Sequence, residues 1–291
     1  MNIIFQINGG IGKCVIATAV CEAIKKKYPE SKLIVVSGYD EVFLNNPNVH
    51  RSFNFNSLSY FYEEFIENKE VILLAHDPYL TAEHIQYKEH LIKTWCRIFD
   101  LEYNGEQPKI YLTDRERNFF SKKYTTDKPV FLIQPNGGGG GDIKYSWARD
   151  IPFKLMQKVI NEFKDDYNVV HIKRDDQISY ENTFAVSDTF RSLAVLIELS
   201  EKRLFMDSFA QHTAAAMDRP STVLWVANKP NVFGYSLHDN IISNSFTAEP
   251  ELKNAYLSKF NIGGDLLEFP YNNEDEIFNY EEIIQSLKNH N

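Results

Sequence analysis

The sequence predicts an α/β protein with two parallel-sheet domains, and two observations support this. Short apolar stretches that suit strands alternate with helical patterns, which is typical of a parallel sheet covered by helices. The alternation starts at the N-terminus and again near residue 130, and in each half a glycine-rich turn follows the first strand. We therefore expect two Rossmann-like domains, with ligands bound at the carboxyl ends of the strands in the cleft between them.

The first domain is expected over residues 1–126. Its strands are expected at 2–7, 32–36, 51–55 and 70–74. The last of these is apolar enough to be buried on both faces of a sheet. Helices are expected from about Ile11 to Lys27, from Thr81 to Phe99, and after Thr113, where the pattern Thr-x-x-Glu forms a capping box.

The second domain is expected over residues 127–275. Lys128-Pro129, at its beginning, resembles a linker. Its strands are expected at 130–134, 168–172, 203–206 and 221–226. Helices are expected at 152–163, 189–199 and 208–217, and a final one at 280–288. A run of five glycines, residues 137–141, follows the first of these strands.

Composition and charge exclude several classes of protein. The 291 residues include 31 Lys and Arg against 40 Asp and Glu, a net charge of −9, which argues against general nucleic-acid binding. No apolar stretch reaches the ~18 residues that a membrane helix needs, and the N-terminus lacks a basic signal region. Three cysteines, Cys14, Cys21 and Cys96, form no metal-type pair or disulfide framework. We expect a cytoplasmic protein, and peripheral membrane contact remains open.

The turn after the first strand contains Asn8, Gly9, Gly10, Gly12 and Lys13, and three kinds of site share this pattern. A phosphate-binding P-loop would need a first glycine where Ile7 stands and a hydroxyl where Cys14 stands. A variant P-loop of partitioning-type ATPases is a closer match but also lacks its first lysine and its hydroxyls. A dinucleotide fingerprint would need a third glycine in place of Val15.

The third interpretation is a cleft-lining turn of a two-domain transferase, which also accounts for the second half of the chain. A purely structural alternative is a tight turn that binds no ligand. Such a turn does not require three glycines beside a lysine, so this alternative is disfavoured. In each interpretation that involves a ligand, the helix N-terminus favours an anion. In the transferase interpretation, the residues expected to bind the acceptor or an anion are Asn8, Gly9, Gly10 and Gly12.

The stretch 203–217, RLFMDSFAQHTAAAM, carries the most specific pattern in the chain. Ser208 and Gln211 have the spacing of a Ser-x-x-Gln capping box at the start of a helix. The stretch closely resembles the Asp-Ser/Thr-Gly-x-x-His-x-Ala-Ala-Ala motif of the heptosyltransferase family, glycosyltransferase family 9. The resemblance is strong over about residues 1–50 and 200–235, and it covers both domains in outline.

This resemblance implies the GT-B fold and an inverting transfer of a sugar from a nucleotide diphosphate, usually without a metal. It implies no cofactor besides the donor, and a glycan or lipid-linked glycan as acceptor. In that fold the final segment, 276–291, commonly packs back onto the N-terminal domain.

A departing nucleoside diphosphate needs its growing negative charge neutralised, and helix N-termini and cationic side chains can do this without magnesium. Purely structural roles remain open for three of the candidate segments. Residues 137–141 could be a loop without a ligand, 173–174 a solvated turn, and His212 a core histidine. The donor-binding candidates are Gly137, Gly138, Gly139, Lys144, Trp147, Arg149, Lys173, Arg174, Asp207, Ser208, Gln211 and His212.

One departure from the family concerns catalysis. The family usually places an aspartate, the general base, after the glycines of the first turn, whereas this chain has Lys13. A lysine near its free pKa is a poor base, so Lys13 is better suited to binding an anion. Asp77, which follows the strand at 70–74, is the best remaining base, ahead of His76, Glu83 and His84. The chain could also be a nucleotide-sugar-binding protein without turnover, or a P-loop-like ATPase.

Overall fold

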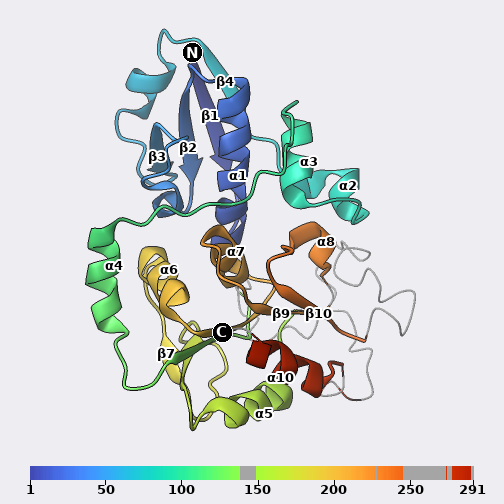
Figure 1. Ribbon diagram of the computed structural model, residues 1–291. Coiled ribbons are helices and arrows are strands. Elements are labelled where there is room, and N and C mark those ends of the chain that lie inside the picture. The colour runs from blue at the N-terminus through green and yellow to red at the C-terminus, as the bar shows by residue number, and fades with distance from the viewer. Residues whose placement is uncertain (138–148, 227, 245–272, 274–276, 290–291) are drawn as a thin grey trace.

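The computed structural model describes residues 1–137, 149–226, 228–244, 273 and 277–289, and these residues form two parallel sheets (Figure 1). The N-terminal half holds a four-stranded sheet in the order β3-β2-β1-β4. Its strands are β1 (Asn2–Ile7), β2 (Lys32–Ser37), β3 (Arg51–Asn54) and β4 (Val71–Leu74). All four were predicted from the sequence.

The C-terminal half holds a six-stranded parallel sheet in the order β10-β9-β8-β5-β6-β7. The two edge strands, β7 and β10, are short, and their sequences carry no distinct strand pattern, so they were not predicted. The strands are β5 (Val130–Gln134), β6 (Asn168–Ile172), β7 (Phe184–Val186), β8 (Lys202–Met206), β9 (Thr222–Trp225) and β10 (Asp239–Ile242).

Helix α1 (Ile11–Lys27) joins the two halves, because its first turn contacts α7 (Phe209–Ala216) of the C-terminal half (Figure 1). Gly12 permits this contact. A methyl group added there would lie 3.0 Å from Cδ2 of His212 and 3.4 Å from the Phe209 Cα. Around this contact, one hydrophobic cluster holds side chains of both halves, among them Trp95 and Trp225.

Helix α4 (Asp114–Phe120), in the segment that connects the sheets, begins with the predicted capping box between Thr113 and Glu116. The Glu116 carboxylate also accepts hydrogen bonds from Nε and Nη2 of the buried Arg191, at 2.7 and 2.8 Å. Arg191 lies on α6 (Phe190–Leu199), so the connecting helix packs on the C-terminal half. The domain division at residue 126 stays a prediction.

Two expectations about the N-terminal half are wrong. The single helix expected from Thr81 to Phe99 is divided into α2 (Ala82–Ile85) and α3 (Leu91–Ile98), because Tyr87 takes a left-handed conformation with φ +53°. Strand β4 is not buried on both faces. It is an edge strand, and 62% of the Leu73 side chain is exposed.

The final helix, α10 (Tyr280–Asn289), corrects a third expectation. It packs on α5 (Phe153–Phe163) and on β8, β9 and β10 of the C-terminal half, rather than back on the N-terminal half. Ile283 and Leu287 lie in the C-terminal core, and the Lys202 ammonium donates to the Leu287 carbonyl at 2.9 Å. The apolar face of α10 is therefore buried within the C-terminal half. Among the described residues, no helix is long and apolar enough to cross a membrane.

Gly12→Ala is expected to destabilise the fold by about 1–3 kcal/mol, because the added methyl group overpacks the contact between α1 and α7. Gly10→Ala is the matched control, since a methyl group at Gly10 meets nothing within 4 Å. Replacing this N-cap glycine should cost only about 0.5 kcal/mol. Urea unfolding of both variants measures the difference, and equal losses would contradict the packing role of Gly12.

Candidate functional site

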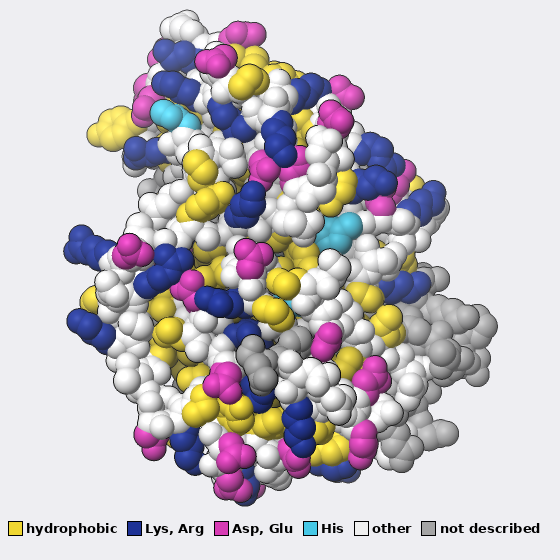
Figure 2. Space-filling model, viewed as in Figure 1, with side chains coloured by type: hydrophobic (Ala, Val, Ile, Leu, Met, Phe, Trp, Pro, Cys, Tyr) yellow, Lys and Arg dark blue, Asp and Glu magenta, His cyan; other side chains and the backbone are white. Residues whose placement is uncertain are grey.

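A cavity of about 910 Å³ lies between the two halves. The turn before α1 forms one wall, and the ends of β5, β6 and β8 with the start of α7 form the other. In the view of Figure 2, lysine and arginine side chains lie on the surface where the two halves meet. The predicted site residues that line the cavity are Gly9, Gly10, Gly12, Lys13, Arg149, Lys173, Arg174, Asp207, Ser208 and His212.

Other predicted residues lie elsewhere. Asn8 is exposed beside the cavity wall. Gly137 is fixed by its neighbours, since its N–H donates to Asp150 at 2.8 Å and its carbonyl accepts from the Gln177 amide at 2.7 Å. Gly138, Gly139, Lys144 and Trp147 lie outside the described residues.

Lys13 and Asp77 form an ion pair at the N-terminal wall. The Lys13 Nζ lies 2.6 Å from Oδ2 of Asp77, with 5% of the lysine side chain and 29% of the aspartate side chain exposed. The other carboxylate oxygen, Oδ1, accepts a hydrogen bond from the Tyr79 N–H at 2.9 Å. The lysine ammonium also lies over the Tyr79 ring, 4.3 Å from its centroid. Both charges are thus held in place, with the lysine facing the cavity and the carboxylate behind it.

His84 lines the same wall and is 2% exposed. Its ring stacks on Tyr79, with a centroid distance of 4.6 Å and an interplanar angle of 12°. Burial lowers the pKa of His84 to about 4, so its imidazole is neutral at pH 7. A neutral imidazole can accept a proton, so His84 is a second candidate for a proton acceptor at this wall, besides the predicted Asp77.

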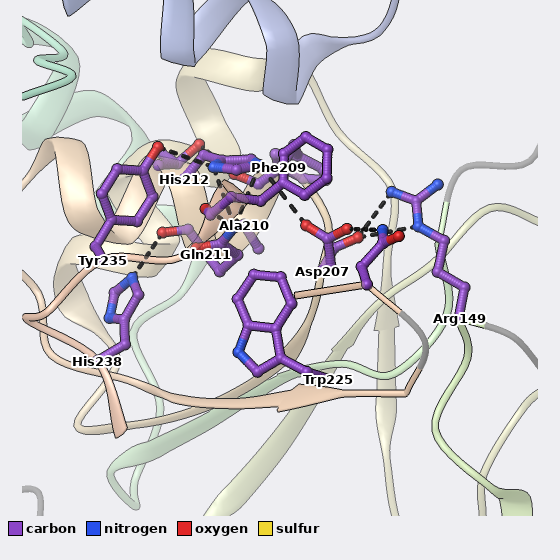
Figure 3. A network of polar contacts seen from close by, with 12 residues as sticks. Arg149, Asp207, Phe209, Ala210, Gln211, His212, Trp225, Tyr235 and His238 are labelled. Atoms are coloured by element: carbon purple, nitrogen blue, oxygen red, sulfur yellow. Dashed lines mark hydrogen bonds and ion pairs between the residues drawn. The ribbon is translucent and has the colours of Figure 1, made fainter. Parts of the chain in front are cut away.

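The start of α7 differs from the predicted capping box. Within the described residues, the Ser208 side chain makes no capping hydrogen bond. Gln134 Oε1 instead accepts from the Ala210 N–H at 3.3 Å. The Gln211 side chain points into the interior and donates to the Phe233 carbonyl at 3.1 Å (Figure 3). Ser208 and Phe209 therefore bring a helix N-terminus to the cavity, where it favours an anion.

His212 belongs to a buried polar network that Figure 3 shows. Its Nδ1 lies 2.9 Å from the Tyr235 hydroxyl, and Nε2 of His238 donates to the Gln211 carbonyl at 2.9 Å. Burial holds the pKa of His212 well below its usual range, so the ring is neutral. His212 is thus both a hydrogen-bonded interior histidine and part of the cavity wall.

Asp207, at the end of β8, is buried and held from two sides (Figure 3). Arg149 donates from Nη2 and Nε to the Asp207 backbone carbonyl, at 2.7 and 3.1 Å. The Asn228 amide donates to the Asp207 carboxylate. Burial raises the pKa of this carboxyl group, and the Arg149 guanidinium opposes that effect. The network fixes the turn from β8 into α7.

Lys173 and Arg174 follow β6 and also line the cavity. The Lys173 ammonium donates to the Ser179 hydroxyl at 2.9 Å, and Nε of Arg174 donates to Asp176 at 3.0 Å. With Lys13 and Arg149, they bring four cationic side chains to one cavity. Such a group of cations, next to the N-terminus of α7, can neutralise a diphosphate.

No family model matches the sequence, and no curated protein does either. Solved structures do match. A glycosyl transferase of family 9 from Veillonella parvula is similar over 99% of this chain and 96% of its own, with a TM-score of 0.69 and 15% identity. The E. coli ADP-heptose lps heptosyltransferase II matches over 83% of this chain and 90% of its own, with a TM-score of 0.64 and 13% identity.

A third match is the dodecameric iron-containing heptosyltransferase TibC in complex with ADP-D-beta-D-heptose. It is similar over 97% of this chain and 71% of its own, with a TM-score of 0.65 and 14% identity. The chain has the GT-B fold. This confirms the predicted fold class of two Rossmann-like domains.

Within this GT-B fold, several cavity residues were not predicted from the sequence. Tyr79 and Gln134 line the cavity without belonging to a recognisable motif. Asn136 and Asn228 follow β5 and β9, at the carboxyl ends of parallel strands. Because ligands bind at those ends, the position of the two asparagines after predicted strands was a usable signal.

Proposed function

We propose that this chain is a glycosyltransferase. It transfers the sugar of a nucleotide-diphosphate sugar to a glycan or lipid-linked glycan. The donor binds mainly to the C-terminal half and the acceptor to the N-terminal half. One observation carries the proposal: the cavity combines the N-terminus of α7 with Lys13, Arg149, Lys173 and Arg174. This arrangement suits a diphosphate, and the GT-B fold of sugar transferases supports the assignment.

The proposed reaction is a single displacement with inversion. The acceptor hydroxyl attacks the anomeric carbon, the bond from that carbon to the diphosphate oxygen breaks, and the hydroxyl proton passes to a base. The leaving diphosphate gains negative charge, which the cations and the helix N-terminus stabilise. The mechanism uses no metal and no cofactor besides the donor.

Asp77 is the proposed base, and Lys13 is the residue that positions it. The hydrogen bonds from Lys13 and from the Tyr79 N–H fix both carboxylate oxygens, and the side chain keeps 29% exposure, so a proton can reach it. Lys13 also presents its charge to the cavity. Together the two residues replace the loop aspartate of the resembling family.

A nucleotide-sugar-binding protein without turnover is the second candidate, favoured by Lys13 in place of that aspartate. A P-loop-like ATPase finds less support, because Cys14 lacks the hydroxyl that binds magnesium and Ile7 stands where the first glycine of the loop should be. Sugar transfer, binding without turnover and magnesium-dependent ATP hydrolysis are three distinct outcomes of one set of assays.

Nucleoside diphosphates and their sugars are expected to raise the thermal unfolding temperature. At 100 times its dissociation constant, a ligand stabilises a protein by about 2.7 kcal/mol. A panel of ADP, UDP and GDP with their sugars, including ADP-D-beta-D-heptose, tests this. Lys173→Ala should weaken nucleoside diphosphate binding about fivefold to tenfold and leave nucleoside binding unchanged. Lys122→Ala, at an exposed lysine, is the control. A panel in which no nucleoside diphosphate stabilises the protein would contradict the proposed function.

A further inference from the structure

The Asn136 side chain is a buried amide in the wall of the cavity. It lies two residues after β5, is 1% exposed and lines the cavity. Among the residues that the structure describes, neither Oδ1 nor Nδ2 has a hydrogen-bond partner. Buried amides are nearly always hydrogen-bonded, and leaving one unpaired lowers stability. An unpaired amide in a cavity wall is therefore a place where a ligand supplies the missing partners.

Two further polar side chains lie at the same edge of the sheet. β9, β8 and β5 are neighbours in the sheet, and Asn228, Asp207 and Asn136 follow them in that order. All three are at least nine-tenths buried and line the cavity. The Asn228 amide nitrogen donates to Asp207, while its Oδ1 has no partner within the described part of the chain. The edge thus offers unpaired acceptors, an unpaired donor and a carboxylate.

The chemistry of this edge selects among the groups of a nucleotide sugar. A phosphate only accepts hydrogen bonds, so it would leave the unpaired amide oxygens of Asn136 and Asn228 without a donor. A hydroxyl group both donates and accepts, so it can satisfy an amide oxygen, an amide nitrogen or a carboxylate. Lys173 and Arg174, which suit phosphate, follow β6 on the other side of β5. The unpaired amide groups of Asn136 and Asn228 thus follow β5 and β9, whereas Lys173 and Arg174 follow β6.

We infer that Asn136, with Asn228 and Asp207, binds hydroxyl groups of the transferred sugar and so determines which sugar the protein accepts. The inference rests on the proposed function. We assign these side chains to the transferred sugar rather than to the ribose of the nucleotide. The reason is that Asp207 precedes the turn into α7, and this turn contacts the start of α1. A methyl group at Gly12 would lie 3.5 Å from the Phe209 nitrogen, so the start of α1 lies against the turn that follows Asp207. The reacting end of the donor belongs between them.

The test compares binding of a nucleotide sugar and of its nucleoside diphosphate by isothermal titration calorimetry. The first probe pair is ADP-D-beta-D-heptose and ADP, and the UDP- and GDP-sugars with their diphosphates follow. Asn136→Ala should weaken binding of the nucleotide sugar tenfold or more and change binding of the diphosphate less than twofold. Asn136→Ser, which restores one donor and one acceptor, should lie between. Asn161→Ala, on the exposed face of α5, is the matched control.

A stability measurement separates this role from a structural one. Without ligand, Asn136→Ala should unfold at a higher urea concentration than wild type, because the variant buries no unpaired amide. A lower midpoint would show that Asn136 supports the fold, which would overturn the inference.

The binding experiment can overturn the inference in other ways. Equal losses of affinity for the nucleotide sugar and for the diphosphate in Asn136→Ala would place the site at the ribose. Unchanged affinity for both ligands would also overturn the inference. A wild-type protein that binds the diphosphates but gains no affinity from any sugar overturns this inference alone. One that binds neither overturns the proposed function as well.

Discussion

Asp77→Asn is expected to lower the rate of sugar transfer by about 10² to 10⁴-fold, the range that a positioned general base contributes. Asparagine keeps the shape of the side chain and can still accept from the Tyr79 N–H, but its amide takes no proton from an acceptor hydroxyl. The initial rate of nucleoside diphosphate release in the presence of acceptor measures this. Donor binding should be unchanged, because Asp77 lies on the N-terminal wall behind Lys13.

Lys13→Met tests the same pair from the other side. It keeps most of the buried length of the side chain and removes the charge that holds Asp77, so transfer should fall while the fold is retained. Lys13→Ala should lower turnover in the same way. Lys13→Asp, the residue of the resembling family, should not restore transfer, because it places a second carboxylate beside Asp77. Lys109→Ala, on an exposed lysine, serves as the control.

His84→Gln decides between the two proton acceptors of this wall. Unchanged transfer in Asp77→Asn together with a large loss in His84→Gln would give the role of base to His84. Unchanged transfer in Lys13→Ala would place Lys13 outside the reaction.

The second large effect concerns acid stability. His171 lies on β6 and is fully buried, and neither ring nitrogen has a hydrogen-bond partner among the described residues. Burial lowers its pKa to about 4, whereas the unfolded chain takes up a proton near pH 6.5. The folded state binds fewer protons in that interval. The stabilisation is therefore complete above pH 6.5 and is lost as the pH falls towards 4.

The free energy of unfolding should accordingly fall between pH 7.5 and pH 4.5, on the order of 2–3 kcal/mol for His171 alone. Burial lowers the pKa of His84 and His90 to about 4 as well, so both act in the same direction. His171→Phe should remove its own share of the loss, which urea unfolding at the two pH values measures. His76→Gln, at an exposed side chain, is the control. An equally steep loss in His171→Phe would show that this histidine is not responsible.

Local signals predicted the fold well where the partners of an element are close in sequence. The capping box of Thr113 and Glu116 formed as expected, because both residues belong to one helix turn. The similar pattern of Ser208 and Gln211 did not form. There, Gln134 and Phe233, both remote in sequence, took over the hydrogen bonds. Tertiary partners thus overrode a local pattern.

The site was predicted in the same uneven way. The motif residues Gly12, Asp207 and His212 came to one cavity as the family resemblance suggested. The pairing of Lys13 with Asp77 joins residues 64 positions apart, so spacing in the sequence could not reveal it. Each was predicted separately, Lys13 from its place in the glycine turn and Asp77 from its place after a strand. Asn136 was not predicted, because a single asparagine before a run of glycines forms no recognisable motif.

The hydrophobic cluster beneath the cavity makes the two sheets one cooperative folding unit. Trp95 of the N-terminal half and Trp225 and Phe233 of the C-terminal half are buried in this single cluster. Separating the halves would bring apolar side chains of both into water, at about 25 cal/mol per Å². Neither half therefore reaches its full stability as an isolated fragment, and damage to either core is transmitted to the other.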